Sequence, residues 1–352
     1  MAKYSPIKKV TISDVSKQAG VSIATVSRVL NNTLPVSEET AMRVRAAIDE
    51  LNFIPNTSAR VLAGGKTYVI GLIIPEIAAL SLIPLLAGIE AATRAVGYGL
   101  LIYASGADSV SGEKIRHILN ENNTDGLLVY VNSLDDEELT RLSRMGFPVV
   151  LLHHTPPKSL SIPYITFRNK HAAQELVDHL IEVHGYRRIA WLRGPDGHED
   201  SASREQGYCK SLSDHNFPLD PELMGYGGFN YRDARETVSC WLKQKMEIDA
   251  IFAGADEAAF GAISAIWDAG RRVPEDIAVV GFDDIDLGRH LFPPLTTIHA
   301  DFERAGREAV LQLVNLVTTG KASNKVIAPT RLVIRRSCNC PWEPDSPASN
   351  SG

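Results

Sequence analysis

The sequence predicts a small all-α head of helix-turn-helix type, followed by a large α/β body made of two doubly wound parallel-sheet lobes. Two short amphipathic patterns flank Ala19-Gly20-Val21, and beyond Thr67 short β-branched runs alternate with amphipathic helices. Charge divides in the same way: residues 1–66 hold 9 Lys and Arg against 5 Asp and Glu, a net of +4, whereas the whole chain is −6 and the remainder is therefore −10. A basic head on an acidic body is typical of a protein whose head binds phosphate groups through Lys and Arg.

The first helix is expected to begin at Thr11, because Thr is a preferred N-cap and Asp14 stands at the third helical position. A carboxylate there can accept hydrogen bonds from the free amides of the first turn. Gly20 can adopt the left-handed conformation that ends the helix. Three apolar residues share one face: Ile12, Val15 and Ala19.

Ser22 is placed to cap a second helix. Its apolar side consists of Val26, Val29 and Leu30. The side chains left facing outward are Ile23, Ala24, Ser27, Arg28 and Asn31. One interpretation is an ordinary helical hairpin with a solvated face, but such a face rarely combines Ile and Ala with a single Arg.

A helix that enters the major groove of DNA explains this face better. Arg28 can bind guanine O6 and N7 with two hydrogen bonds, while Ile23 and Ala24 contact thymine methyl groups. Ser22 and Thr25, near the positive end of the helix, can hold phosphates. The residues of this head that we assign to DNA contact are Thr11, Ser22, Ile23, Ala24, Thr25, Ser27, Arg28 and Asn31.

A third helix completes the head, which is expected to span residues 1–54. Ser37 caps it, and Glu38 and Glu39 lie in its first turn, where negative charge is favourable. Its inner face is apolar: Val44, Ala47, Ile48 and Leu51.

The stretch that follows resembles a known family. The residues GVS..TVSRVLN, the join Asn52-Phe53-Ile54-Pro55-Asn56 and the segment Ala59-Arg60-x-Leu62 are similar to those of the lactose-repressor and galactose-repressor (LacI/GalR) family of bacterial transcription regulators, over nearly the entire chain. The resemblance implies that residues 55–66 form a hinge helix on DNA, in which Leu62 wedges into the minor groove, the small Ala59 lets two hinges pack together, and Asn56 joins the interface. The alternative is that Leu62 docks on the body.

The body, expected over residues 67–335, is read from its alternation of strands and helices. Strands are expected at 68–74, 99–104, 126–131, 148–152, 163–167, 188–192, 250–254, 277–282 and 331–335. Helices are expected at 84–96, 170–183, 203–214, 231–245, 257–268 and 301–318. Ligands in such folds bind at the carboxyl ends of the strands. The resemblance implies a periplasmic-binding-protein-like body with one lobe at 67–165 plus part of 298–330, and a second at 166–297 with 331–335.

Several other classes of protein are disfavoured. The four cysteines are too few and too scattered for a disulfide framework, and Cys338-Asn339-Cys340 lacks a second pair of ligands at zinc spacing, so no metal and no cofactor is expected. No signal-peptide pattern precedes the head, which argues against a secreted solute-binding protein and for a cytoplasmic, nucleoid-associated one. No catalytic motif such as G-x-S-x-G or G-x-G-x-x-G appears, so no catalytic residue is assigned and we expect a non-enzyme.

The resemblance also implies six effector-binding residues between the lobes. They are Ser81, His153, Arg204, Phe229, Asp283 and Phe302. Charged groups can orient a polar ligand, and aromatic faces can stack on a sugar or base ring. Each has a plainer alternative: Arg204 could pair with Glu205 or Glu199 at the surface, Asp283 could cap a turn, and the two Phe side chains could be core.

Three positions depart from the family. His153 replaces an acidic residue and Ala255 an amide of the lactose repressor, and Arg168 stands where many members have Asp. These changes imply a site with fewer acceptors for sugar hydroxyl groups and more positive charge. We therefore expect a sugar or sugar-acid effector with a preference for anionic or partly apolar ligands.

Together these patterns predict a sequence-specific DNA-binding repressor that reads inverted half-sites as a homodimer. The tail at 336–352 is rich in Pro and Ser and is expected to be disordered. Because it lacks the heptad repeat of a tetramer-forming tail, we expect a dimer. The alternative is a family regulator controlled by a partner protein such as a phosphocarrier.

Overall fold

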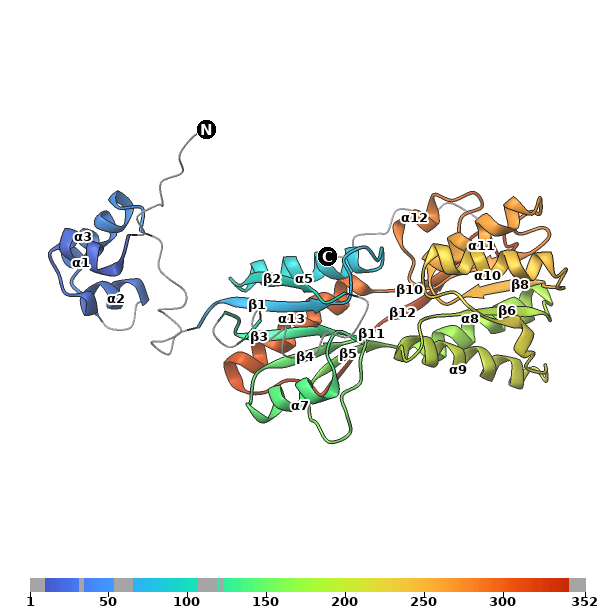
Figure 1. Ribbon diagram of the computed structural model, residues 1–352, viewed down its shortest axis with the longest axis horizontal. Helices are drawn as coiled ribbons and strands as arrows, with labels where there is room; N and C mark the ends of the chain where they lie inside the picture. Colours follow the sequence, from blue (N-terminus) through green and yellow to red (C-terminus); the bar gives the residue numbers. More distant parts are fainter. Residues whose placement is uncertain (1–9, 32–34, 54–65, 107–118, 121–122, 342–352) are drawn as a thin grey trace. The chain divides into compact units, whose positions relative to one another are not determined.

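The computed structural model describes residues 10–31, 35–53, 66–106, 119–120 and 123–341. It separates into two compact units, residues 1–67 and 68–352, which are described in turn (Figure 1). Residues 55–65 of the expected hinge (55–66), and residue 54 at the end of the expected head, lie outside the described part of the chain.

The head consists of three short helices, as the sequence predicts. They are α1 (Ile12–Ala19), α2 (Ile23–Asn31) and α3 (Glu38–Glu50). The Asp14 carboxylate accepts from the backbone N–H of Thr11 at 2.9 Å, and Gly20 ends α1 with a φ of 65°. Ser22 caps α2, since its hydroxyl accepts from the Thr25 N–H at 3.1 Å. The buried core of the head is Val15, Ala19, Val26, Val44, Ala47 and Phe53.

The first lobe of the body is built on a six-stranded parallel sheet in the order β11-β5-β4-β3-β1-β2. The strands are β1 (Val69–Ile74), β2 (Gly99–Ala104), β3 (Gly126–Tyr130), β4 (Val149–Leu152), β5 (Tyr164–Phe167) and β11 (Lys325–Ala328). Helices α5 (Leu82–Ala95) and α13 (Phe302–Thr319) pack on one face, and α7 (Asp136–Arg144) packs on the other. Successive side chains of β3 point to opposite faces of the sheet. Leu128 therefore packs with α5 and α13, whereas Leu127 and Val129 pack with α7.

The second lobe has a four-stranded parallel sheet in the order β7-β6-β8-β9. Its strands are β6 (Ile189–Arg193), β7 (Met224–Tyr226), β8 (Ala250–Ala253) and β9 (Ala278–Val280). Helices α8 (Asn169–His184) and α9 (Glu199–Asp214) cover one face, α10 (Tyr231–Lys243) and α11 (Asp256–Asp268) the other. Two short helices, η1 (Pro221–Leu223) and α12 (Asp286–Arg289), lie in its connections.

Two antiparallel strands, β10 (Thr297–Ala300) and β12 (Thr330–Val333), carry the chain between the lobes. Figure 1 shows them running from the second sheet towards α13 and β11. The division into two parallel-sheet lobes is as expected. The sequence did not predict the strands β7, β10 and β11.

The C-terminal end corrects one boundary. We expected a disordered tail from residue 336, but Ser337 and Cys338 are fully buried. The N–H of Val279 donates to the carbonyl of Ser337 at 3.0 Å, so this segment continues the edge of the second sheet. Its backbone hydrogen bonds and burial hold it in place, and the described part of the body continues to Pro341. Among the described helices, none is long and apolar enough to cross a membrane.

Candidate functional site

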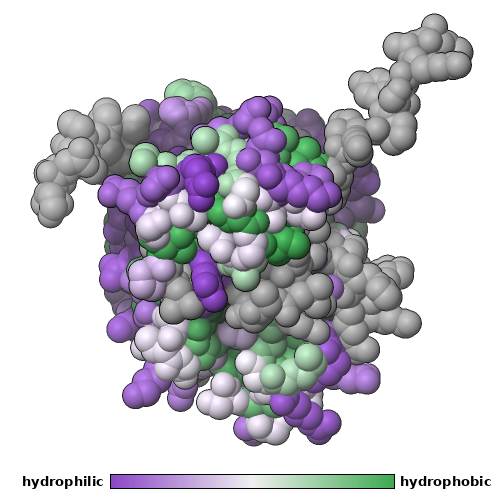
Figure 2. All heavy atoms as spheres, turned by 90° about the vertical axis from the view of Figure 1, so that its left-hand side faces the viewer, coloured by the Kyte–Doolittle hydropathy of each residue, from purple (hydrophilic) through white to green (hydrophobic). Residues whose placement is uncertain are grey.

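The head exposes the surface that the sequence singled out. Ile23 is 49% exposed, and Ala24 and Arg28 are exposed beside it on α2, so two apolar side chains and one cation share this surface. Ser22 and Thr25 lie at the start of this helix with their hydroxyl groups 2.9 Å apart. In Figure 2, which views the molecule from the side where Figure 1 draws the head, hydrophobic and hydrophilic side chains are interspersed. The first turn of α2 therefore presents apolar and hydroxyl groups, with Arg28 one turn further on.

The remaining residues assigned to DNA are placed less completely. The Thr11 hydroxyl donates to Asp14 at 2.7 Å, and Ser27 is half-buried on α2. The side chain of Asn31 and the hinge residues Asn56, Ala59 and Leu62 lie outside the described part of the chain.

In the body, the carboxyl ends of the strands bring candidate effector residues together. His153 follows β4 directly, Phe229 comes after β7, and Asp283 comes after β9. All three have a positive φ, of 59°, 57° and 122°. Residues other than Gly rarely adopt this backbone conformation. It is found most often at binding sites, where contacts with the surrounding structure enforce it.

Arg204 of α9 is the centre of this cluster and is almost fully buried. Its Nε donates to the side-chain oxygen of Asn169 at 2.9 Å, its Nη1 donates to the carbonyl of Gly254, and its Nη2 lies 3.5 Å from Asp283. The guanidinium lies 3.6 Å from the ring centre of Phe282. The surface pairing of Arg204 with Glu205 or Glu199 is therefore wrong.

Phe229 closes one side of the same cluster. Its ring lies 5.4 Å from the Arg204 guanidinium and meets the His198 ring edge-on at 5.1 Å. The ring occupies the space where Gly194 and Gly254 lack a side chain, because a Cβ at either glycine would overlap it. Two glycines at the ends of β6 and β8 thus make room for this aromatic face.

His153 joins the two lobes. Its Nδ1 lies 3.0 Å from a carboxylate oxygen of Asp200, and its ring packs against Tyr130, Phe167 and Phe302 at 5.1, 5.0 and 5.5 Å between centres. The Nε2 of His153 is buried and has no hydrogen-bond partner among the described residues. A buried polar atom without a partner is costly, so this nitrogen is available to a ligand.

Asp200 and Asn169 belong to this cluster but were not predicted from the sequence. Asp200 accepts from Asn169 at 2.6 Å as well as binding His153, and both Asp200 and Asn169 are buried. The expected helix began at residue 203, which left Asp200 in a loop, whereas α9 begins at Glu199. A spacing of four residues places Asp200 and Arg204 on one face of that helix, and this was the available signal.

Electrostatics divides the buried acids into two kinds. Burial alone would raise the pKa of Asp200, but the hydrogen bond and charge of His153 and the charge of Arg204 lower it to about 2. Burial raises the pKa of Asp283 to about 7, against the opposing effect of Arg204. Burial also lowers the pKa of His198 to about 4. The site therefore pairs a firmly ionised carboxylate with one that titrates near neutral pH.

Ser81 does not join this cluster. It is half-buried at the start of α5 and forms no hydrogen bond with the other candidates among the described residues. Its neighbour Leu80 donates a backbone hydrogen bond to Glu257 of α11 at 3.0 Å, and Thr155 donates one to Glu199 of α9 at 3.0 Å. These contacts and the pair formed by His153 hold the two lobes against each other.

The expected excess of positive charge at the site is wrong. Arg168 is exposed at the start of α8 rather than directed into the cluster, and Ala255 is a buried cap of α11. Two buried acids lie against Arg204 instead, since its Nη2 is 4.0 Å from Asp200 and 3.5 Å from Asp283. Asp256 is also fully buried and accepts from the Thr297 hydroxyl at 2.6 Å and the Ile285 N–H at 2.9 Å, but burial raises its pKa well above 3.8 and so favours its neutral form.

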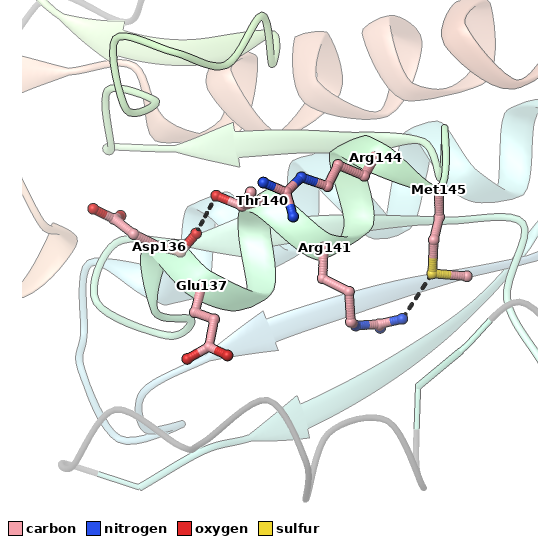
Figure 3. Close-up of a pocket in the computed structure, with 6 residues that line it drawn as sticks. All are labelled: Asp136, Glu137, Thr140, Arg141, Arg144 and Met145. Atoms are coloured by element: carbon pink, nitrogen blue, oxygen red, sulfur yellow. Dashed lines mark hydrogen bonds between the residues drawn. The ribbon is translucent and has the colours of Figure 1, made fainter.

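The surface depression on α7 has a different character (Figure 3). It is lined by Asp136, Glu137, Thr140, Arg141, Arg144 and Met145. All six come from one helix and its end, and the Arg141 guanidinium there donates to the Met145 sulfur at 2.8 Å. Since a single solvated helix supplies the lining, this depression brings together no groups from different elements of the kind seen around Arg204.

Comparisons with known proteins agree with both units. Residues 11–56 match the family described as "Bacterial regulatory proteins, lacI family", and residues 177–338 match a "Periplasmic binding protein-like domain". The regulator RegA of Clostridium acetobutylicum is 34% identical over 87% of this chain and 92% of its own length. CelR of Thermobifida fusca is 32% identical over 94% and 98%, and the repressor PurR of Photorhabdus laumondii is 33% identical over 93% and 96%.

Solved structures give the same result. A lac repressor dimer bound to operator and the anti-inducer ONPF has a TM-score of 0.82 at 29% identity, covering 94% of this chain and 99% of that one. A complex of the regulator CelR with cellobiose has a TM-score of 0.70 at 30% identity, covering 94% and 100%.

Proposed function

Because this chain belongs to the LacI family of bacterial regulatory proteins, we propose that it represses transcription by binding an inverted-repeat operator as a homodimer, under the control of a sugar-type effector. The observation that carries the proposal is the outward face of α2. A 49% exposed Ile23, with Ala24 and Arg28 beside it, gives a helix apolar groups for thymine methyls and one cation for guanine. The protein would act on the nucleoid in the bacterial cytoplasm.

The head would bind DNA through two kinds of contact. The hydroxyl groups of Ser22 and Thr25 would contact phosphates at the positive end of α2, while Ile23, Ala24 and Arg28 would read bases. Hinge residues Asn56, Ala59 and Leu62 would reach the minor groove at the centre of the operator. Two heads related by the dimer axis would then read two half-sites in opposite orientation.

The effector would bind where His153, Arg204, Phe229, Asp283 and Phe302 lie, with Ser81 completing the site only if the lobes shift. The chemistry of this cluster favours a neutral ring that carries hydroxyl groups. Carboxylates accept from hydroxyl groups, Arg204 and the unpartnered His153 nitrogen bind oxygen atoms, and Phe229 offers a face for stacking. The buried, ionised carboxylate of Asp200 would repel an additional carboxylate or phosphate.

The operator half of the proposal is tested by selecting bound duplexes from a random pool and measuring affinity for the selected site by fluorescence anisotropy. We expect the selected duplexes to share an inverted repeat with two equally selected halves. The dissociation constant should rise steeply with salt concentration, because contacts with phosphates release counterions. Selection of a single, unrepeated site would contradict the dimeric arrangement.

The effector half is tested by thermal-shift measurements with neutral sugars, sugar acids and phosphorylated sugars. A ligand that binds the folded state alone stabilises it by an amount that grows with its concentration. We expect stabilisation by a neutral sugar that is lost in Arg204→Ala and kept in Arg193→Ala. Stabilisation by anionic sugars alone would overturn the choice of ligand, and stabilisation only by a phosphocarrier protein would favour control by a partner.

A further inference from the structure

Two histidines and two cysteines meet at the edge of the second lobe. His179 and His184 come from the last turns of α8, and Cys338 and Cys340 come from the segment that follows β12. Their four ligand atoms all lie within 4.8 Å of one another. About 160 residues separate the two pairs in sequence, and for this reason the sequence analysis, which sought a second pair at short spacing, found no metal site.

The distances in this cluster match those of a tetrahedral metal site. The Nε2 of His179 lies 3.7 Å from the sulfur of Cys338 and 3.6 Å from that of Cys340, while the Nε2 of His184 lies 3.3 Å from the sulfur of Cys340. Zinc bonds of about 2.3 Å to sulfur and about 2.0 Å to nitrogen place tetrahedral sulfur and nitrogen ligands about 3.5 Å apart. The ligand atoms therefore already have the spacing that zinc requires.

The backbone at both ends of the cluster directs these side chains inward. His184 is the final residue of α8, and Gly185 ends the helix with a φ of 70°. Between the cysteines, Asn339 has a φ of 79° in a turn whose N–H donates to the carbonyl of Arg336 at 3.0 Å. This left-handed residue lets two cysteines separated by a single residue face the same histidines.

Further contacts orient the ligands. The His184 ring stacks on Tyr186 at 5.3 Å, and the Tyr186 hydroxyl donates to the carbonyl of Cys338 at 3.4 Å. The Thr296 hydroxyl donates to the Cys338 sulfur at 3.1 Å, and the same sulfur lies 3.5 Å from the carbonyl oxygen of Arg335. Contacts of this kind fix the orientation of metal ligands.

We propose that His179, His184, Cys338 and Cys340 bind one Zn²⁺ ion in a closed tetrahedral site. Two thiolates and two neutral imidazoles balance the charge of the ion, which suits a site in which Cys338 is fully buried and His179 is only 8% exposed. His184 and Cys340 are half-buried and provide a route for the ion. Four protein ligands leave no open coordination position, so the site is structural rather than catalytic.

The ion would fasten the end of the ordered chain to α8. The segment at 335–340 follows the crossing strand β12, and its anchorage fixes where that strand enters the second lobe. Arg335 makes a buried ion pair with Asp284 at 2.6 Å just before the cysteines. Loss of zinc would thus loosen one of the two strands that connect the lobes.

The test uses the purified full-length chain, stripped of metal under reducing conditions and titrated with ZnCl₂ or CoCl₂. We expect one tightly bound zinc per chain, and for cobalt the intense visible bands of tetrahedral coordination together with a thiolate-to-metal charge-transfer band. Fewer than one bound zinc per two chains, or a cobalt spectrum without thiolate charge transfer, would overturn the proposal. This measurement on the unmodified chain does not depend on the folding of any variant.

Variants then identify the ligands. Cys340→Ser and His184→Gln, at the half-buried positions, should weaken zinc binding by more than about 10-fold. Cys240→Ser and His290→Gln remove an exposed cysteine and an exposed histidine and should leave it unchanged. Zinc should also raise the melting temperature of the unmodified chain and of both controls, but not that of the two ligand variants. Equal zinc binding in Cys340→Ser and Cys240→Ser would contradict the assignment.

Discussion

Arg28 is the one positively charged side chain on the outward face of α2, and it is exposed. If it binds a guanine with two hydrogen bonds, Arg28→Ala should lose about 1–3 kcal/mol of discrimination at a single base pair of each half-site. Affinity for single-base variants of the selected operator measures this effect. Arg45→Ala removes an exposed charge from α3 and should weaken binding to all sequences alike, if at all. Uniform weakening in Arg28→Ala would instead assign Arg28 to a phosphate.

Asp283 gives the stability of the body a distinctive dependence on pH. Burial raises its pKa from 3.8 to about 7, so between about pH 4 and pH 7 the folded chain retains a proton that the unfolded chain has lost. Stability contributed at this position is therefore present at low pH and is lost as the pH rises towards 7. His198, with its pKa lowered from 6.5 to about 4, has the opposite effect over much of the same range.

The two effects are separated by comparison with Asp283→Asn. The free energy of unfolding of the unmodified chain, relative to this variant, should fall by a few kcal/mol, to an order of magnitude, between about pH 4 and pH 7. Denaturant titrations at several pH values measure it. Asp286→Asn, in which an exposed carboxylate is removed, should show no such trend. A constant difference between unmodified chain and Asp283→Asn would mean that Asp283 is ionised throughout.

At the scale of residues, the sequence predicted single side chains better than their partners. Arg204, His153 and Asp283 were expected near one another, but their mutual contacts depend on Asp200 and Asn169, which carry no recognisable motif. Whether a polar side chain is buried with a partner depends on packing between distant segments. A local sequence pattern does not determine which distant segments pack together.

Helix pairs in the body pack through glycines. A Cβ at Gly306 would overlap the carbonyl of Leu85 between α13 and α5, one at Gly207 would overlap the carbonyl of Lys170 between α9 and α8, and one at Gly261 would overlap that of Tyr231 between α11 and α10. In each pair a backbone carbonyl occupies the place of a side chain. Close helix contacts of this kind hold the layers that cover both sheets.

Gly207→Ala should therefore destabilise the second lobe by about 1–3 kcal/mol, because the added methyl group meets backbone rather than a movable side chain. Denaturant unfolding measures the change. Gly99→Ala is the matched control, since its Cβ would meet only ordinary contacts at 3.7 Å. If both variants unfold at the same denaturant concentration, α8 and α9 can separate without cost and the close approach has no energetic role.

Strands with continuous apolar runs were predicted, and three short strands with weaker patterns were not. The buried run of β1 reads as a strand because every residue from Ile70 to Ile74 is apolar or Gly. In contrast β7 has three residues, and β10 and β11 have four each with polar side chains among them. Such segments become strands through pairing with neighbours, which is a tertiary effect.

On the scale of the whole molecule, the lobes are held together by more than the two crossing strands. His153 binds Asp200, Thr155 binds Glu199, and Leu80 binds Glu257, each from the first lobe to the second. The third contact is sensitive to its surroundings, because burial raises the pKa of Glu257. A ligand bound at Arg204 and His153 would alter some of these contacts. It would then bind one arrangement of the lobes more tightly than another, which regulation by an effector requires.

Coupling between effector and operator leads to a prediction for Leu62, which lies outside the described residues. If Leu62 wedges into the operator, Leu62→Ala should weaken operator binding while the affinity of DNA-free protein for effector stays unchanged. Reciprocity requires the effector to change operator affinity by the same factor by which operator changes effector affinity, about 5- to 150-fold. Measuring both affinities with and without the other ligand, in the unmodified chain and the variant, tests the scheme. Equal loss of both affinities in Leu62→Ala would place Leu62 against the body, and unequal factors in the unmodified chain would mean that the two ligands do not act on one equilibrium.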